Sequence, residues 1–109
     1  GVAYATFDDL CAQALGPCDF LMFAETFHTL VMKNIPIMGP SKRNEAKRFV
    51  TLIDALYEAK VKFICSAEAG PAELYTLGDG TFEFERTVSR LIEMQSPDYM
   101  ASPHTPAAT

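Results

Sequence analysis

The fold of this chain is decided by the stretch from residue 29 to residue 66, which reads TLVMKNI (29–35), a loop, NEAKRFVTLIDALYEA (44–59) and VKFICS (61–66). The first and last segments are short and rich in apolar and β-branched residues, as is typical of buried strands. Between them, apolar residues recur at steps of three and four, which predicts an amphipathic helix. These residues are Ala46, Phe49, Val50, Ile53, Leu56 and Tyr57. A strand, a helix and a second strand form a βαβ unit, which requires parallel pairing and a right-handed crossover. The sequence therefore predicts an α/β fold.

The long helix has a predicted cap and a predicted orientation. Ser41 or Asn44 is available to cap its first turn. Phe49 and Ile53 are expected to point onto the sheet. The polar residues off the apolar stripe are expected to face water, and they are Lys47, Thr51, Asp54 and Glu58.

Two helices are expected before the first of these strands. Thr6 and Asp9 have the spacing of a capping box, so a short helix should begin here and end before Gly16. Pro17 suits the first position of a second helix. That helix carries apolar residues around most of its circumference, which predicts a core position; they are Phe20, Leu21, Phe23, Ala24 and Phe27.

The C-terminal third contains a loop, a last helix and a tail. Gly70-Pro71 opens the loop, which carries one helical turn at residues 72–75, and residues 77–80 (LGDG) form a turn by composition. The apolar stripe of the last helix is expected to be Phe84, Val88, Leu91 and Ile92. Beyond Ser96 the chain is rich in proline and small residues, which favours disorder. We therefore expect one α/β domain over residues 1–95 and a disordered tail over residues 96–109.

Composition limits the class of protein. A chain of 109 residues forms one domain, and it has no apolar run near the roughly 20 residues that a membrane helix needs. A net charge of −5 argues against a nucleic-acid surface spread over the domain. The one basic cluster consists of Lys42, Arg43, Lys47 and Arg48, which either docks a partner or forms a solvated helix face.

The cysteines and histidines give no clear site. Cys11, Cys18 and Cys65 have no CxxC spacing, so we expect reduced, buried thiols in a cytoplasmic protein, and no metal site. One alternative is a catalytic Cys65 with His28 as its base. The other is that His28 is a hydrogen-bonded residue at a helix-to-strand junction. The aromatic residues Phe23, Phe27, Phe49, Tyr57 and Phe63 are expected to form core and not a stacking surface for bases.

Two arginines in the last helix are the candidate site residues. Arg86 and Arg90 lie four residues apart in FEFERTVSRLIEM (82–94), so both guanidinium groups leave the same face of a helix and could hold one anion. The alternative is that they pair with carboxylates inside the domain: Glu83, Glu85, Glu93 or Asp54. We expect Arg86 to have the structural role and Arg90, on a more open face, to be the functional candidate.

Four blocks of sequence carry a family resemblance. In order and spacing, FHTLVMKNIPIM (27–38), RNEAKRFVTLIDALYEAKVKFICSAE (43–68), ELY (73–75) and FEFERTVSRLIEMQSPDYM (82–100) resemble the C-terminal end of the ZapE family of P-loop ATPases, also called AFG-one-like ATPases. The resemblance extends from about Phe7 to Met100. Residues 40–43 and 76–80 fall where relatives are expected to vary.

The resemblance implies ATP hydrolysis in a longer parent protein that uses ATP and Mg²⁺, with a Walker A loop and Walker B acids upstream. This chain contains no G-x-x-x-x-G-K-[ST], so the segment alone is expected to be inactive toward ATP. Its strand–helix–strand order resembles the family's own ATPase core, with residues 35–39 in place of the Walker B acids. The segment is thus expected to be a degenerate P-loop or AAA-type subdomain.

Two hypotheses for function follow. In the first, the chain is the C-terminal domain of a ZapE-like ATPase and couples nucleotide state to partner binding. The resemblance implies that one partner is the rest of the ATPase core. A second implied partner is the division ring in bacteria, or misassembled membrane proteins in mitochondrial relatives. The implied location is the cytoplasm, or the periphery of the inner membrane or the division site. In the second, it is a free-standing α/β interaction module without chemistry.

Overall fold

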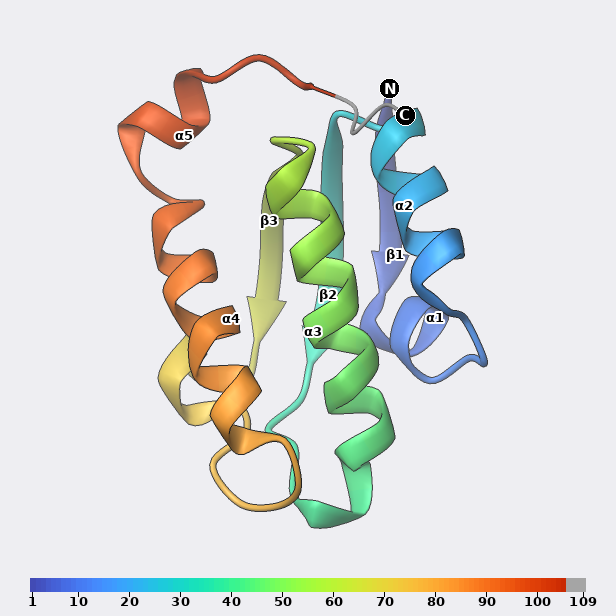
Figure 1. Cartoon of the computed structure of the whole chain (residues 1–109), viewed down its shortest axis with the longest axis vertical. Coiled ribbons are helices and arrows are strands. Elements are labelled where there is room, and N and C mark those ends of the chain that lie inside the picture. Colours follow the sequence, from blue (N-terminus) through green and yellow to red (C-terminus); the bar gives the residue numbers. More distant parts are fainter. Residues whose placement is uncertain (106–109) are drawn as a thin grey trace.

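Three parallel strands form a single sheet in the computed structural model, which describes residues 1 to 105 (Figure 1). The strands are β1 (Val2–Thr6), β2 (Thr29–Ile35) and β3 (Lys62–Ala67), and they lie in the order β1-β2-β3. Strands in sequential order with crossovers of one hand place their connecting helices on the same face of the sheet. Figure 1 shows these helices in front of the sheet: α1 (Phe7–Cys11), α2 (Pro17–Thr26) and α3 (Arg43–Glu58). The predicted α/β class and the predicted βαβ unit are confirmed.

Helix α3 lies at the centre of the helix layer, between α2 and α4 (Thr81–Glu93) (Figure 1). Phe49 and Ile53 are fully buried, as predicted. The Phe49 ring lies 5.9 Å from the ring of Phe7 and 6.1 Å from that of Phe84, measured between centroids. Leu52 and Ala55 are also buried, whereas Val50 and Tyr57 are only half-buried. The buried face is broader than the predicted stripe because α3 packs against helices on two sides as well as against the sheet.

The starts of the helices are capped differently. At α1 the predicted capping box is present: the Thr6 hydroxyl accepts from the Asp9 amide at 3.1 Å, and the Asp9 carboxylate accepts from the Thr6 amide at 2.9 Å. The prediction that Ser41 or Asn44 caps α3 is wrong. A 3₁₀ turn, η1 (Pro40–Lys42), runs directly into α3, and no side chain caps the junction.

The N-terminal region differs from the prediction in two ways. Strand β1 was not predicted, because its five residues VAYAT carry only one β-branched apolar residue and resemble a loop. Helix α2 begins at Pro17 as predicted, but it is less buried than expected. Phe20 and Ala24 are buried, Phe23 and Phe27 are half-buried, and Leu21 is exposed. The reason is its position at the border of the helix layer, where α3 covers only one side of it.

The last helix turns a different face to the core than predicted. Phe84 and Leu91 of α4 are buried as predicted, but Ile92 is 60% exposed and Thr87 is fully buried in its place. The loop before α4 contains the 3₁₀ turn η2 (Pro71–Glu73). The predicted turn at residues 77–80 is confirmed, with positive φ angles at Gly78 and Gly80. A side chain at Gly78 would collide with the Tyr75 hydroxyl, because a Cβ there would lie 2.6 Å from that oxygen.

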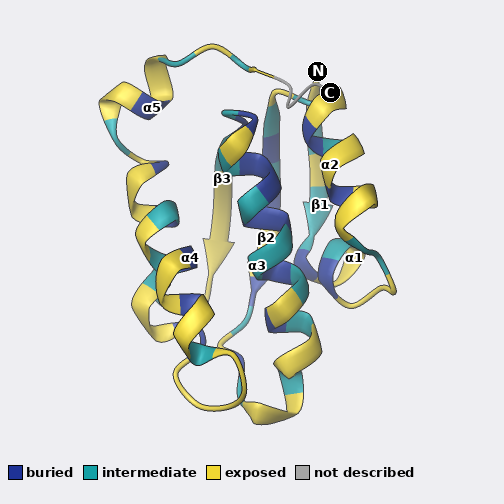
Figure 2. Cartoon of the chain, viewed as in Figure 1, coloured by how far each residue is buried: buried dark blue, intermediate teal, exposed yellow. Residues whose placement is uncertain are grey.

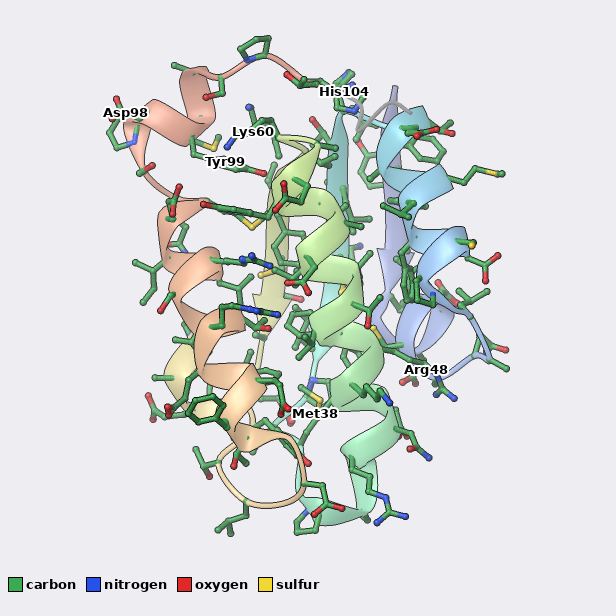
Figure 3. All side chains as sticks on the ribbon, in the orientation of Figure 1. Met38, Arg48, Lys60, Asp98, Tyr99 and His104 are labelled. Atoms are coloured by element: carbon green, nitrogen blue, oxygen red, sulfur yellow. The ribbon has the colours of Figure 1, made fainter. Side chains whose placement is uncertain are left out.

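The region after Ser96 contradicts the expected disordered tail up to residue 105. A short helix, α5 (Pro97–Ala101), buries Tyr99, whose hydroxyl donates to the carbonyl of Val61 at 2.6 Å. The His104 ring nitrogen Nε2 lies 2.7 Å from the carbonyl oxygen of Ala24. Figure 3 shows this segment crossing above the sheet, with Tyr99 pointing inward and His104 near the end of α2. The buried Tyr99 and the contact of His104 anchor the segment despite its composition. Residues 106–109, the rest of the predicted tail, lie outside the described residues.

Candidate functional site

Arg86 and Arg90, the two candidate residues on α4, both contact one carboxylate on α3. Arg90 forms an ion pair with Asp54, and its guanidinium carbon lies 4.9 Å from the centroid of the Tyr57 ring. Arg86 reaches the other oxygen of Asp54, with Nη2 3.6 Å from Oδ2. The side chain of Asp54 is 33% exposed. Of the four carboxylates considered from the sequence, Asp54 is thus the one that the pair contacts, across the α3–α4 boundary.

The exposure of the two arginines is the reverse of what we expected. The Arg86 side chain is 61% exposed, whereas that of Arg90 is 21% exposed. The expectation that Arg90 lies on the more open face is wrong, because α4 turns position 90 toward α3 along with Thr87 and Leu91. Arg86 retains exposed surface with which to contact another molecule. Neither contact assigns a catalytic role to either residue.

The Arg90 contact continues into a stack of side chains from α3, the turn after it, and α5. The Tyr57 and Tyr99 rings are stacked with centroids 6.1 Å apart, and Lys60 Nζ lies 5.0 Å from the Tyr57 centroid. The Tyr57 hydroxyl donates to Glu93 Oε2 at 2.9 Å, and this hydrogen bond is the main reason why the pKa of Tyr57 is raised. The Arg90–Tyr57–Tyr99 stack, as we name it, joins α3, α4 and α5.

Polar groups at the carboxyl ends of β2 and β3 hold a bent stretch of backbone. The strand pairing shifts between Met32 and Ile35, and Asn34 adopts a φ of 64°, which asparagine tolerates better than most residues. The Ser66 hydroxyl accepts from the Asn34 amide at 3.0 Å. Glu68 Oε1 accepts from the Ile37 amide at 2.8 Å. This edge is where ligands bind in open parallel sheets, but here its polar side chains hydrogen-bond the chain's own backbone.

The basic cluster is divided between two local contacts. Arg48 Nη1 donates to the carbonyl of Cys11 at 3.0 Å and thereby joins α3 to the end of α1. Arg43 Nη1 lies 3.5 Å from Asp79 Oδ2, and both side chains are exposed. Arg43 and Lys47 line a groove of about 470 Å³ that is also lined by Asp79 and Glu83. Its mixed charge gives no uniform attraction for an anionic ligand.

The cysteines are not all buried, which corrects the sequence prediction. Cys11 is fully buried, and burial raises the pKa of its thiol to about 12, whereas Cys18 and Cys65 are exposed. Cys65 does not meet His28. Thr29 is the strand partner of Lys62, so His28 lies level with Val61, and Cys65 is four residues further along, or roughly 13 Å at 3.3 Å per residue. His28 Nδ1 hydrogen-bonds the Thr29 hydroxyl at 2.8 Å, which confirms its role at the junction.

Among the aromatic residues expected in the core, only Phe49 is fully buried; Phe23, Phe27, Tyr57 and Phe63 are half-buried. Within residues 1 to 105, no three His, Cys, Asp or Glu side chains are grouped so as to hold a metal ion. None of the helices in this same range is both long enough and apolar enough to cross a bilayer.

Comparison with known proteins places the chain in a family. The AFG1-like ATPase family model matches residues 1–103. The chain is 38% identical over 99 residues to the cell division protein ZapE of Escherichia coli K12, covering 91% of this chain and 26% of that protein. It is 31% identical to the lactation elevated protein 1 homolog B of Danio rerio, covering 93% of this chain and 26% of that protein. The chain thus spans about a quarter of the length of these relatives. No solved structure shows a significant match. The match over nearly the whole chain shows that it belongs to the AFG1-like ATPase family.

Proposed function

We propose that this chain is the C-terminal part of an ATP-hydrolysing, ZapE-like protein, and that it has a structural and coupling role without nucleotide chemistry of its own. The observation that carries the proposal is the family match over residues 1–103, combined with the absence of a Walker A sequence from those same residues. The family's phosphate-binding loop must then lie in another part of the full-length protein.

The residues present do not fit a complete Mg-ATP site. A phosphate cradle requires a glycine-rich loop followed by lysine, and none of the six glycines is followed by Lys-Ser or Lys-Thr. Asp54, the carboxylate beside the candidate arginines, is engaged by both of them and is poorly placed to hold Mg²⁺. In the parent protein Mg²⁺ neutralises charge on the transferred phosphoryl group. Of the two candidate arginines, only Arg86 is exposed enough to be added to such a site.

The coupling role rests on the α3–α4 boundary. Asp54 holds two arginines, one of them well exposed, and α4 is joined through the Arg90–Tyr57–Tyr99 stack to α5. A contact that displaces Arg86 from Asp54 would change the charge balance on Arg90 and therefore the packing of α4 on α3. The exposed guanidinium group of Arg86 is thus linked through the Asp54 carboxylate to the more buried Arg90.

ATP binding and hydrolysis measured on two proteins test the main proposal. The full-length protein is expected to hydrolyse Mg-ATP, and residues 1–109 alone are expected to show no heat of binding in isothermal titration. A dissociation constant in the micromolar range for residues 1–109 would contradict the proposal. A full-length protein without any ATPase activity would instead favour the free-standing interaction module.

The arginines are tested in the full-length protein by comparing Arg86→Met with Arg90→Met. Arg90→Met is expected to lower the melting temperature, with turnover reduced only as far as unfolding explains. If Arg86 contacts the phosphates of the parent's site, Arg86→Met should leave melting unchanged and reduce turnover about 10²-fold or more, since an arginine of that kind contributes about 10³–10⁵. The opposite pattern would restore Arg90 as the functional candidate.

The partners and location remain part of the proposal. The relative in Escherichia coli is named a cell division protein, which supports the division ring as a partner of the full-length protein. We further propose a location in the cytoplasm or at the periphery of the inner membrane, and no nucleic-acid partner. Recruitment of the tagged full-length protein to the division site, compared with a form lacking this segment, tests whether the segment contributes to partner binding.

A further inference from the structure

Within residues 1–105, one face of the sheet carries no helix. The side chains of Leu30 and Met32 point to the helix layer and are fully buried, so the alternate residues of β2 point to the opposite side. We call this side the open face, and it comprises Val2, Tyr4, Thr6, Thr29, Val31, Lys33, Ile64 and Ser66. Lys62 lies at its border, where its Nζ donates to the carbonyl of Tyr99 at 3.0 Å. The connecting helices of the described residues lie on the other side (Figure 1). Figure 2, viewed from the helix side, shows much of β1 and most of β3 as half-buried or exposed.

An apolar row crosses the open face at its centre. Tyr4 is the strand partner of Val31, and Val31 is the strand partner of Ile64, so the three side chains stand next to one another. Tyr4 is 75% exposed and Ile64 is 55% exposed, and Val2 beside them is 42% exposed. Large apolar side chains gathered in register on three strands differ from the scattered apolar residues of an ordinary surface.

Parallel sheets in α/β proteins are almost always covered on both faces. The chain covers only about a quarter of the length of its relatives, so about three quarters of such a protein lies outside it. A segment of the same polypeptide meets this face at a high effective concentration, whereas a second copy must reach it by diffusion. Both considerations favour an occupant from the same chain.

We propose that the open face packs against another part of the same full-length polypeptide, through the row Tyr4–Val31–Ile64. This inference rests on the proposed function, because it requires that the chain be part of a longer ATPase. The occupant presents an apolar surface to the row. Lys33, exposed on the same face, favours an acidic side chain at its border. The contact would transmit movements of the ATPase core to the sheet directly.

Hydroxyl-radical footprinting of the full-length protein tests the proposal. Tyr4 and Phe82 are 75% and 83% exposed here, so Phe82 on α4 is the matched control. Tyr4 is expected to be oxidised several-fold more slowly than Phe82, at protein concentrations where the protein is a monomer. Ile64→Asp, which places an unpaired carboxylate in the row, should raise Tyr4 oxidation to the level of Phe82, and Phe82→Asp should leave Tyr4 protected. Equal oxidation of Tyr4 and Phe82 in the unmodified monomer would overturn the proposal.

The occupant is identified by photo-crosslinking from benzoylphenylalanine at position 4. The expected product joins position 4 to a peptide of the same chain outside residues 1–109. A product joined to a second copy or to another protein would overturn the proposal. ATP hydrolysis is measured in the same preparations. Normal hydrolysis with an unprotected Tyr4 would refute the docking and leave the proposed function intact, whereas a protected Tyr4 without hydrolysis would refute the ATPase function alone.

Discussion

The two faces of the sheet are built by the same three strands but have opposite environments. Toward the helices, Leu30 and Met32 are fully buried and the central ring of Phe49 packs between Phe7 and Phe84. Toward the other side, Tyr4 and Ile64 are largely exposed, although Ile64 is as apolar as the residues that are buried. The helix-covered face accounts for the stability of the described residues, and the open face is available for a contact outside them.

The largest expected effect comes from the helix-covered face. Phe49→Ala should lower the free energy of unfolding of residues 1–109 by about 3–5 kcal/mol, because it removes a fully buried ring and leaves a cavity. The measurement is urea denaturation followed by circular dichroism. A domain of this size has only about 5–15 kcal/mol in total, so the loss should be obvious. Melting within a degree or two of the parent would mean that this face does not carry the stability.

A smaller effect is expected at the border of the helix layer. Asp54→Ala should cost about 1–3 kcal/mol, because it leaves the half-buried Arg90 without its charged partner. Arg86→Met is the matched control and should cost less than about 1 kcal/mol, as an exposed ion pair does. Denaturation of both variants at low and high salt measures the difference. Equal losses would show that the Arg90–Asp54 pair adds nothing beyond the Arg86 contact, which would contradict this expectation.

The packing of the C-terminal segment is tested by Tyr99→Phe. This variant keeps the ring but removes the hydroxyl that donates to the carbonyls of Val61 and Leu56, which should cost about 1–1.5 kcal/mol. The check is thermal melting together with proteolysis after residue 96. Unchanged melting and rapid cleavage in the parent would show that the segment is loose in solution, as its composition predicts.

Alkaline pH should lower the free energy of unfolding through Cys11, which is buried on the helix-covered side. The buried Cys11 thiol has its pKa raised from 9.0 to about 12, so the folded state keeps a proton that the unfolded state loses. This contribution is complete below pH 9 and declines as pH rises from 9 toward 12, by about 1 kcal/mol at pH 10. Unfolding free energies of the parent and Cys11→Ala between pH 7 and 10.5 measure it. Parallel pH curves for the two proteins would contradict the assignment.

The smallest stability effect is expected on the open face. Ile64→Thr in residues 1–109 should change the unfolding free energy by no more than about 0.5 kcal/mol, because the side chain is already 55% exposed and threonine also suits a strand. The same denaturation assay as for Phe49→Ala gives a direct comparison of the two faces. A loss of several kcal/mol would show that the open face is covered within this chain.

Local patterns were sufficient to predict most of the elements. The periodicity of residues 44–59, the alternation of short apolar strands with this helix, and the Thr6–Asp9 capping box each depend on residues that are near neighbours in sequence. The structure therefore has α3, β2, β3 and the start of α1 where they were predicted. The candidate arginines were also identified by their spacing alone, and Asp54 was among the carboxylates considered as partners.

The errors concern properties that depend on which elements surround a residue. Ile92 was expected to be buried and is exposed, while Thr87 is buried, because the contact with α3 sets the orientation of α4. The relative exposure of Arg86 and Arg90 was reversed for the same reason. The region after Ser96 has the composition of a loose tail, but Tyr99 finds two carbonyl acceptors that only the folded chain brings together.

The sequence by itself determined the α/β class, the family and the absence of a Walker A loop from these residues. Periodicity and short motifs depend only on residues that are close together along the chain. The tertiary structure decided which side of each element is covered. The open face illustrates this, since Tyr4 and Leu30 are both apolar strand residues, and only the one-sided placement of the helices leaves one exposed and buries the other. Sequential strand order and crossovers of one hand produce that one-sided arrangement, which is a property of the whole chain.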